Sequence, residues 1–169
     1  MSLYRREHYT REQQRETKFA PRVWCKGPHI QNFEVVMRTI FHPDHTDENK
    51  NLRVEAISRE DLTKRGFSVF RELHTIKQRM EELEQEMIER KPYREAVGTT
   101  KLLCKNIRNI KDSDNLRAFV VLDSADEERD RGHALILCAE KQSKSKVKEL
   151  KKKLASIMSR LYQLQEIYG

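Results

Sequence analysis

Long apolar runs are missing from this chain of 169 residues. Because no stretch approaches the roughly 18 apolar residues of a membrane span and no apolar signal segment opens the chain, we expect a cytoplasmic protein without a membrane span. The three cysteines are widely spaced and form no Cys-x-x-Cys pair, which excludes a disulfide framework. No phosphate loop, zincin helix or nucleophile elbow is present, so no motif names a reaction.

Charge is plentiful and unevenly distributed. The net charge is +7, with 36% charged and 37% hydrophobic residues. Residues 1–30 hold seven Lys and Arg against three Glu, and residues 140–169 hold eight against three, so the middle of the chain is nearly neutral. Two basic ends are typical of a protein that contacts polyanions. Lysine-rich faces also occur as ordinary solvated surface, and this alternative stays open.

Residues 31–169 are predicted to form one α+β domain behind a mobile basic arm of residues 1–30. β-Branched and aromatic residues predict a strand at 33–41. Ser58 fits the capping box of a short helix that ends at Gly66. Further patterns predict a strand at 67–70 and an amphipathic helix that begins at Leu73 and ends before Pro92.

The second half of the chain predicts more strands and a final helix. Residues 101–110 and 116–122 are expected to pair as adjacent antiparallel strands, the second of them central, and residues 134–138 to form a short buried strand. Ser143 is expected to cap a helix whose apolar stripe continues to Tyr168. This stripe suits a face on the sheet better than a homodimer seam, because only about three heptads are present. The predicted fold is a small, mostly antiparallel sheet of about five strands with two long amphipathic helices.

Three short motifs carry a resemblance. They are HPDH at 42–45, RGFSV at 65–69 and GHALI at 132–136. In these motifs the chain resembles a family of small bacterial proteins without an assigned function, over roughly residues 33–158. The resemblance implies an accessory protein of a multi-gene system such as phage defence or a mobile element, and it assigns no catalytic residue.

Four residues have an order that suits zinc ligands: Cys25, His29, His42 and His45. If residues 33–41 form an extended strand at about 3.3 Å per residue, the first pair lies about 30 Å from the second. Four such ligands cannot surround one ion. We therefore predict no metal and no cofactor.

Histidines and arginines at the predicted strand ends form a second group. Histidine exchanges protons near pH 7 and arginine binds phosphate through two hydrogen bonds, so convergence would suit a small phosphate-directed enzyme, a nuclease or transferase. Histidines beside proline and glycine more often cap backbone groups, so no catalytic residue is assigned. The candidates are His42, His45, His133, Arg65 and Arg71, together with Ser68.

The lysines around the last helix form a third group. Cations near a helix N-terminus oppose the helix dipole, and a polyanion would offset this cost. We therefore expect a non-enzymatic binding or adaptor protein that contacts nucleic acid, an acidic protein surface or a larger complex. No helix-turn-helix, zinc-finger or RNA-recognition signature predicts sequence-specific readout. The nucleic-acid-binding candidates are Lys141, Lys144, Lys146, Lys148, Lys151, Lys152 and Lys153, with Arg5, Arg6 and Arg11 of the arm.

Overall fold

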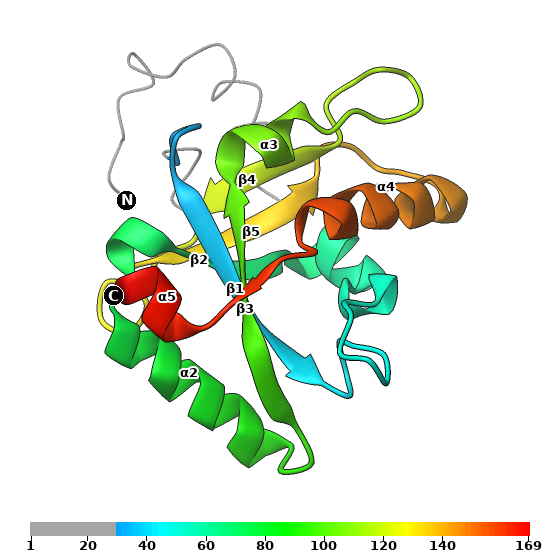
Figure 1. The fold of residues 1–169 in the computed structure, drawn as a ribbon. Coiled ribbons are helices and arrows are strands. Elements are labelled where there is room, and N and C mark those ends of the chain that lie inside the picture. The colour runs from blue at the N-terminus through cyan, green and yellow to red at the C-terminus, as the bar shows by residue number, and fades with distance from the viewer. Residues whose placement is uncertain (1–29) are drawn as a thin grey trace.

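A computed structural model describes residues 30–169, which form an α+β fold around one antiparallel sheet (Figure 1). The strand order is β4-β5-β2-β1-β3-β6. The strands are β1 (Val35–His42), β2 (Phe67–Arg71), β3 (Glu95–Leu103), β4 (Phe119–Asp123), β5 (His133–Cys138) and β6 (Leu161–Tyr162). The helices are α2 (Lys77–Arg90), α3 (Cys104–Asn109), α4 (Lys144–Ile157) and α5 (Leu164–Tyr168), with the short turns η3 (Val54–Ala56), η4 (Asp61–Arg65) and η5 (Glu72–His74). The predicted arm of residues 1–30 lies, except for Ile30, outside the described residues.

The α+β class is confirmed, but the described sheet has six strands rather than five. The additional strand, β6, comes from the predicted final helix, which ends after Ile157. Met158 is fully buried and its carbonyl accepts a hydrogen bond from Thr100 Oγ1 at 3.1 Å. This contact leads the chain onto β3, where Leu161 pairs with Thr100. The prediction that the helix continues to Tyr168 was therefore wrong beyond α4.

The prediction of a strand at residues 101–110 beside a strand at 116–122 was also wrong. The first strand, β3, begins earlier and ends at Leu103, and residues 104–109 form α3. β3 and β4 lie at opposite parts of the sheet, separated by β5, β2 and β1. β4 is an edge strand rather than a central one, yet all five of its residues are buried. A strand covered on both faces is apolar throughout wherever it lies in the sheet.

Other predicted elements are present with small shifts. Strands appear as β1, β2 and β5 at the expected places. Ser58 Oγ accepts a hydrogen bond from Asp61 N at 3.3 Å, and the turn ends at Gly66 with φ +91°. Ser143 caps α4 by accepting from Lys146 N. The helix predicted from Leu73 begins later, at Lys77, so Leu73 is 70% exposed instead of packing on the sheet.

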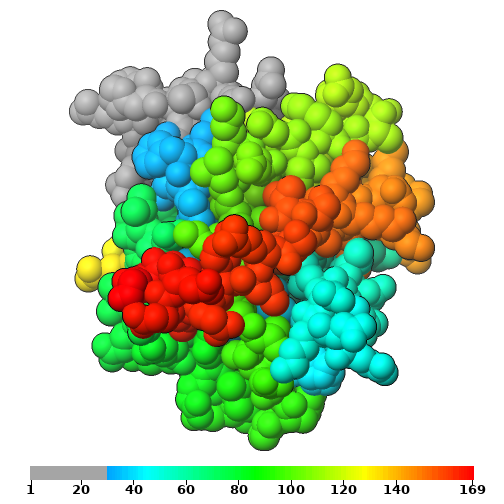
Figure 2. Space-filling view, viewed as in Figure 1, coloured from blue at the N-terminus to red at the C-terminus, as the bar shows by residue number. Residues whose placement is uncertain are grey.

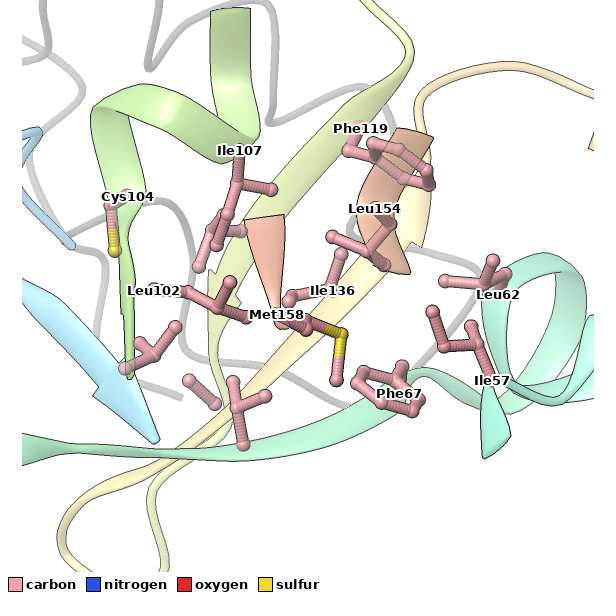
Figure 3. Packing of buried hydrophobic residues seen from close by; sticks show 14 of the residues in the cluster. Ile57, Leu62, Phe67, Leu102, Cys104, Ile107, Phe119, Ile136, Leu154 and Met158 are labelled. Atoms are coloured by element: carbon pink, nitrogen blue, oxygen red, sulfur yellow. The ribbon is translucent and has the colours of Figure 1, made fainter. Parts of the chain in front are cut away.

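The main core lies between one sheet face and the elements α3, α4 and η4. Leu150 and Leu154 of α4 belong to the same buried cluster as Phe119 and Ile136. Figure 3 shows Leu154 and Met158 packed among side chains that include Ile136 of β5. Leu62 of η4 and Ile57 lie beside them. The first half of the predicted apolar stripe thus lies on the sheet of its own chain.

The opposite sheet face carries α2. Side chains alternate along strands, so Ser68, Phe70 and His133 point away from the face that holds Val69 and Ile136. This second face forms a cavity with α2 that is described below. Between residues 30 and 169, no helix combines the length and hydropathy of a membrane span.

Candidate functional site

The HPDH motif forms a turn at the end of β1. His45 N donates to Phe41 O at 2.8 Å, and Phe41 N donates back to His45 Nδ1 at 3.0 Å. His42 Nδ1 lies 2.8 Å from Thr46 Oγ1, and the His42–Pro43 peptide bond is cis. Both histidines of the motif are therefore held by their own turn, as the capping alternative requires.

His45 is kept neutral by its surroundings. Burial, together with the cationic Arg38 and Arg94, lowers its pKa to about 4. Because Nδ1 accepts the Phe41 N–H, the proton of the neutral ring is on Nε2. His45 therefore offers one N–H donor near pH 7 rather than a charge.

His133 begins β5 beside an aromatic ring. Its ring lies edge-on to Phe70 at 5.3 Å between centroids, and its Nδ1 lies 2.6 Å from Ser124 Oγ. Burial lowers the pKa of His133. The preceding Gly132 is required by packing, since a Cβ there would lie 2.0 Å from Thr75 Oγ1.

His45, Ser68 and His133 line one cavity of about 390 Å³ between α2 and the sheet. We call it the α2 pocket. The other members of the predicted histidine and arginine group are absent from its lining, because each is engaged in other contacts. His42 is held in its turn, while Arg65 is exposed and pairs with Glu60 and Asp61.

Arg71 belongs to a buried ionic network instead. Its guanidinium lies 2.7 Å from Glu34 Oε1 and 3.4 Å from Asp123 Oδ2, and all three side chains are nearly buried. Such a network ties β2 to β4 and to the residues before β1. Arg71 is thus paired with both Glu34 and Asp123, and it does not line the α2 pocket.

Four arginines that sequence reasoning did not assign to a site line the α2 pocket. Arg79 and Arg129 are paired with acidic side chains, whereas Arg38 and Arg90 have no such partner in the part of the chain that the structure describes. Arg38 of β1 stacks over the Phe67 ring at 4.0 Å and donates from Nη1 to Ser68 O at 2.7 Å. Arg90 reaches the pocket from the last turn of α2. The available signal for Arg38 was its position inside the apolar run FEVVMRTIF, where a charged residue needs a specific reason.

The lysine group is spread along the exposed side of α4. Lys146 pairs with Asp114 at 2.8 Å and Lys152 with Glu149 at 3.3 Å, while Lys153 donates to Lys111 O at 2.7 Å. Lys148 is exposed and Lys151 half-buried.

Lys141 and Lys144 line a hollow of about 250 Å³ together with Arg59, which lies just before η4, and Lys64 of η4. We call these four residues the basic hollow. Figure 2 shows the start of α4, in orange, above the cyan segment that leads into η4. None of the residues that line this hollow is acidic. Arg59 and Lys64 were missed, because η4 lies far from α4 in the sequence.

Several predicted site residues lie outside the part of the chain that the structure describes. They are Arg5, Arg6 and Arg11, as well as Cys25 and His29 of the zinc arrangement. Within residues 30–169, no group of three or more His, Cys, Asp or Glu side chains is arranged to hold a metal ion.

Comparison of the chain with protein-family models, with curated protein sequences and with solved structures finds no match.

Proposed function

We propose that this protein is a non-enzymatic binding component that contacts the phosphate backbone of nucleic acid through the basic hollow. The observation that supports this is the gathering of Arg59, Lys64, Lys141 and Lys144, from two distant segments, around one hollow with no acidic lining residue. Lysine and arginine bind phosphates without regard to base sequence, and each neutralised phosphate releases counterions.

Helix α4 adds to this attraction. Its first residues line the basic hollow, so the positive end of the helix dipole lies there. Lys144 is the first residue of α4, where a cation is unfavourable in the free protein. A phosphate bound at the hollow would offset this repulsion and pair with the backbone N–H groups at the helix start.

The wider setting is part of the same proposal. The motifs HPDH, RGFSV and GHALI suggest an accessory protein of a bacterial multi-gene system such as phage defence or a mobile element, acting in the cytoplasm. The arginines of the N-terminal segment, Arg5, Arg6 and Arg11, would add further phosphate contacts. An acidic protein surface or a larger complex is the alternative partner, and a failure of the unmodified chain to bind DNA or RNA in the test below would favour it.

The test is fluorescence anisotropy of labelled single-stranded and double-stranded DNA and RNA with the full chain at several salt concentrations. The double variant Lys141→Gln/Lys144→Gln should lower the magnitude of the slope of log affinity against log salt by about 1.4 to 1.8, because each phosphate contact contributes about 0.7 to 0.9. The control Lys91→Gln/Lys105→Gln removes the same charge from exposed positions outside the hollow. An equal loss in both double variants, or no binding by the unmodified chain, would overturn the proposal.

A second candidate, a phosphate-directed nuclease or transferase, has one supporting observation: His45 and His133 line the same pocket. We rank it lower because both rings are bound through Nδ1 to their own surroundings and Arg65 and Arg71 are paired elsewhere. Turnover of RNA, DNA or a nucleotide that disappears in His133→Ala would reverse this ranking.

A further inference from the structure

The α2 pocket is a second site, separate from the basic hollow, and its charges are unbalanced. Three acidic side chains line it, and each already has a cationic partner. Asp61 pairs with Arg65 at 3.2 Å, while Glu86 and Asp130 both bind Arg79, at 2.8 and 2.7 Å. Two other lining residues, Arg38 and Arg90, differ from these pairs. Neither arginine forms an ion pair within residues 30–169.

Of these two arginines, Arg38 is the less exposed to solvent. The pairing of β1 with β2 comprises Val36↔Arg71 and Met37↔Phe70, so Arg38 lies where this ladder stops. Its guanidinium occupies the space beside β2, with one N–H bonded to Ser68 O. Burial lowers the pKa of Arg38 to about 10, which still leaves it charged at neutral pH. Arg38 is half-buried, and the charge of Asp61, with which it makes no ion pair, offsets only part of the cost of burial, so a bound anion would offset the remainder.

Other groups around Arg38 suit the same kind of ligand. His45 is neutral and carries its proton on Nε2, so it can donate one hydrogen bond without adding charge. The lining also has an apolar part, which comes from both sides of the cavity: Phe41, Phe70, Leu83 and Met87. A cavity of about 390 Å³ is in the size range of small-molecule sites, and its lining combines charged groups with this apolar part.

We propose that the α2 pocket binds a small phosphate monoester of the size of a nucleoside monophosphate. A phosphate monoester carries a charge of about −1.5 to −2 at neutral pH, which matches the two unpaired arginines better than a single carboxylate does. Arg38 can bind the phosphate through two N–H groups, and Arg90 adds the second cation at the rim. The body of the ligand packs against Phe41, Phe70 and the apolar residues of α2.

The test is isothermal titration calorimetry of the full chain with the four nucleoside 5′-monophosphates, the corresponding nucleosides and inorganic phosphate. At least one monophosphate should bind more than about tenfold tighter than both its nucleoside and inorganic phosphate. Arg38→Met keeps an apolar side chain over Phe67 and should weaken that binding at least about 10- to 100-fold, because both charge-assisted hydrogen bonds to the phosphate are lost. Arg90→Gln, at an exposed position, should weaken it several-fold without affecting the fold.

Arg53→Gln is the matched control, since it removes an exposed arginine outside the lining whose ion-pair partner, Glu55, is also outside it. It should leave the affinity unchanged. Lys141→Gln/Lys144→Gln should also leave monophosphate binding intact, which separates this site from the basic hollow. The proposal is overturned if no monophosphate binds at about 10 mM, if the nucleoside or inorganic phosphate binds equally well, or if neither Arg38→Met nor Arg90→Gln weakens binding.

Discussion

Helices α2 and α4 have the same length and similar apolar spacing, but they pack very differently. Each spans 14 residues. α4 buries Val147, Leu150 and Leu154, the last two in the main core, whereas α2 buries only Met80. Leu83 and Met87 of α2 are half-buried and face the α2 pocket. An amphipathic stripe therefore predicts a helix, while the surface opposite the helix decides how much of the stripe is buried.

The two helices are also held by different forces. α4 is held by apolar burial, which leaves its outer side available for lysines. α2 is held largely by polar contacts at its edges. Arg79 binds Asp130 of the loop before β5 at 2.7 Å, and Lys77 donates to Gln165 of α5 at 2.8 Å. The polar attachment of α2 accompanies a charged cavity between this helix and the sheet.

The largest effect should come from truncating the buried helix. Leu154→Ala removes a fully buried side chain and should lower the free energy of unfolding by about 2–5 kcal/mol. Leu83→Ala, the matched change on α2, should cost only about 1 kcal/mol, because its side chain is half-buried beside a cavity. Urea denaturation measures both. Equal losses would show that the two helices do not differ in their packing.

Gly132→Ala should disturb the entry into α2. A Cβ at this position would lie 2.0 Å from Thr75 Oγ1 and 3.2 Å from Arg71 O, so the segment before α2 must move away from β5. We expect a loss of about 1–3 kcal/mol, as for other overpacked sites. Adding Thr75→Ala to the same variant is the control, because it removes the Oγ1 that the new Cβ would meet at 2.0 Å and should recover part of the loss. A variant at Gly132 with unchanged stability to urea would contradict the close packing of this entry.

The pH dependence of stability should report on the α2 pocket. The pKa of His45 is about 4 in the folded protein, against an ordinary value of 6.5. Between these two pH values the unfolded chain binds a proton at His45 and the folded chain does not. The free energy of unfolding should therefore fall by roughly 1–2 kcal/mol as the pH drops from 6.5 towards 4, and should be fully restored above 6.5.

His133 is shifted in the same direction and contributes to the same slope. His45→Gln should therefore flatten the slope only in part, while keeping an acceptor for Phe41 N. The measurement is urea denaturation across this pH range for both proteins. An identical slope in the variant would mean that His45 is not kept neutral by its surroundings.

The smallest effect should come from Lys144, and its two consequences should have opposite signs. Lys144→Glu places an anion at the first residue of α4 and should stabilise the fold by about 0.5 kcal/mol through the helix dipole. The same change should weaken nucleic-acid binding, because it reverses a charge of the basic hollow. Lys144→Gln should lie between the two. Thermal melting measures the stability and fluorescence anisotropy measures the nucleic-acid affinity. A loss of both in Lys144→Glu would indicate a structural role for Lys144.

Elements with local signals were predicted well. Ser58 and Ser143 cap helical turns through hydrogen bonds to residues three positions away. Strands β1, β2 and β5 follow short apolar or alternating runs, which depend only on neighbouring residues. The prediction of residues 101–110 failed because the run is compatible with both strand and helix, and packing on β4 selected the helix for α3. The predicted end of the final helix was wrong. The chain leaves α4 after Ile157, where Met158 O accepts a hydrogen bond from Thr100 of β3.

The sequence by itself determined the basic ends, the capped helical turns and the turn that holds His42 and His45. These features rest on charge and on hydrogen bonds within a few residues. Only the tertiary structure decided that His45 and His133 line one cavity, that Arg71 serves an ionic network, and that η4 and the residues before it supply two cations to the start of α4. The reason is that strand order and helix placement depend on the whole core, which no short stretch of sequence encodes.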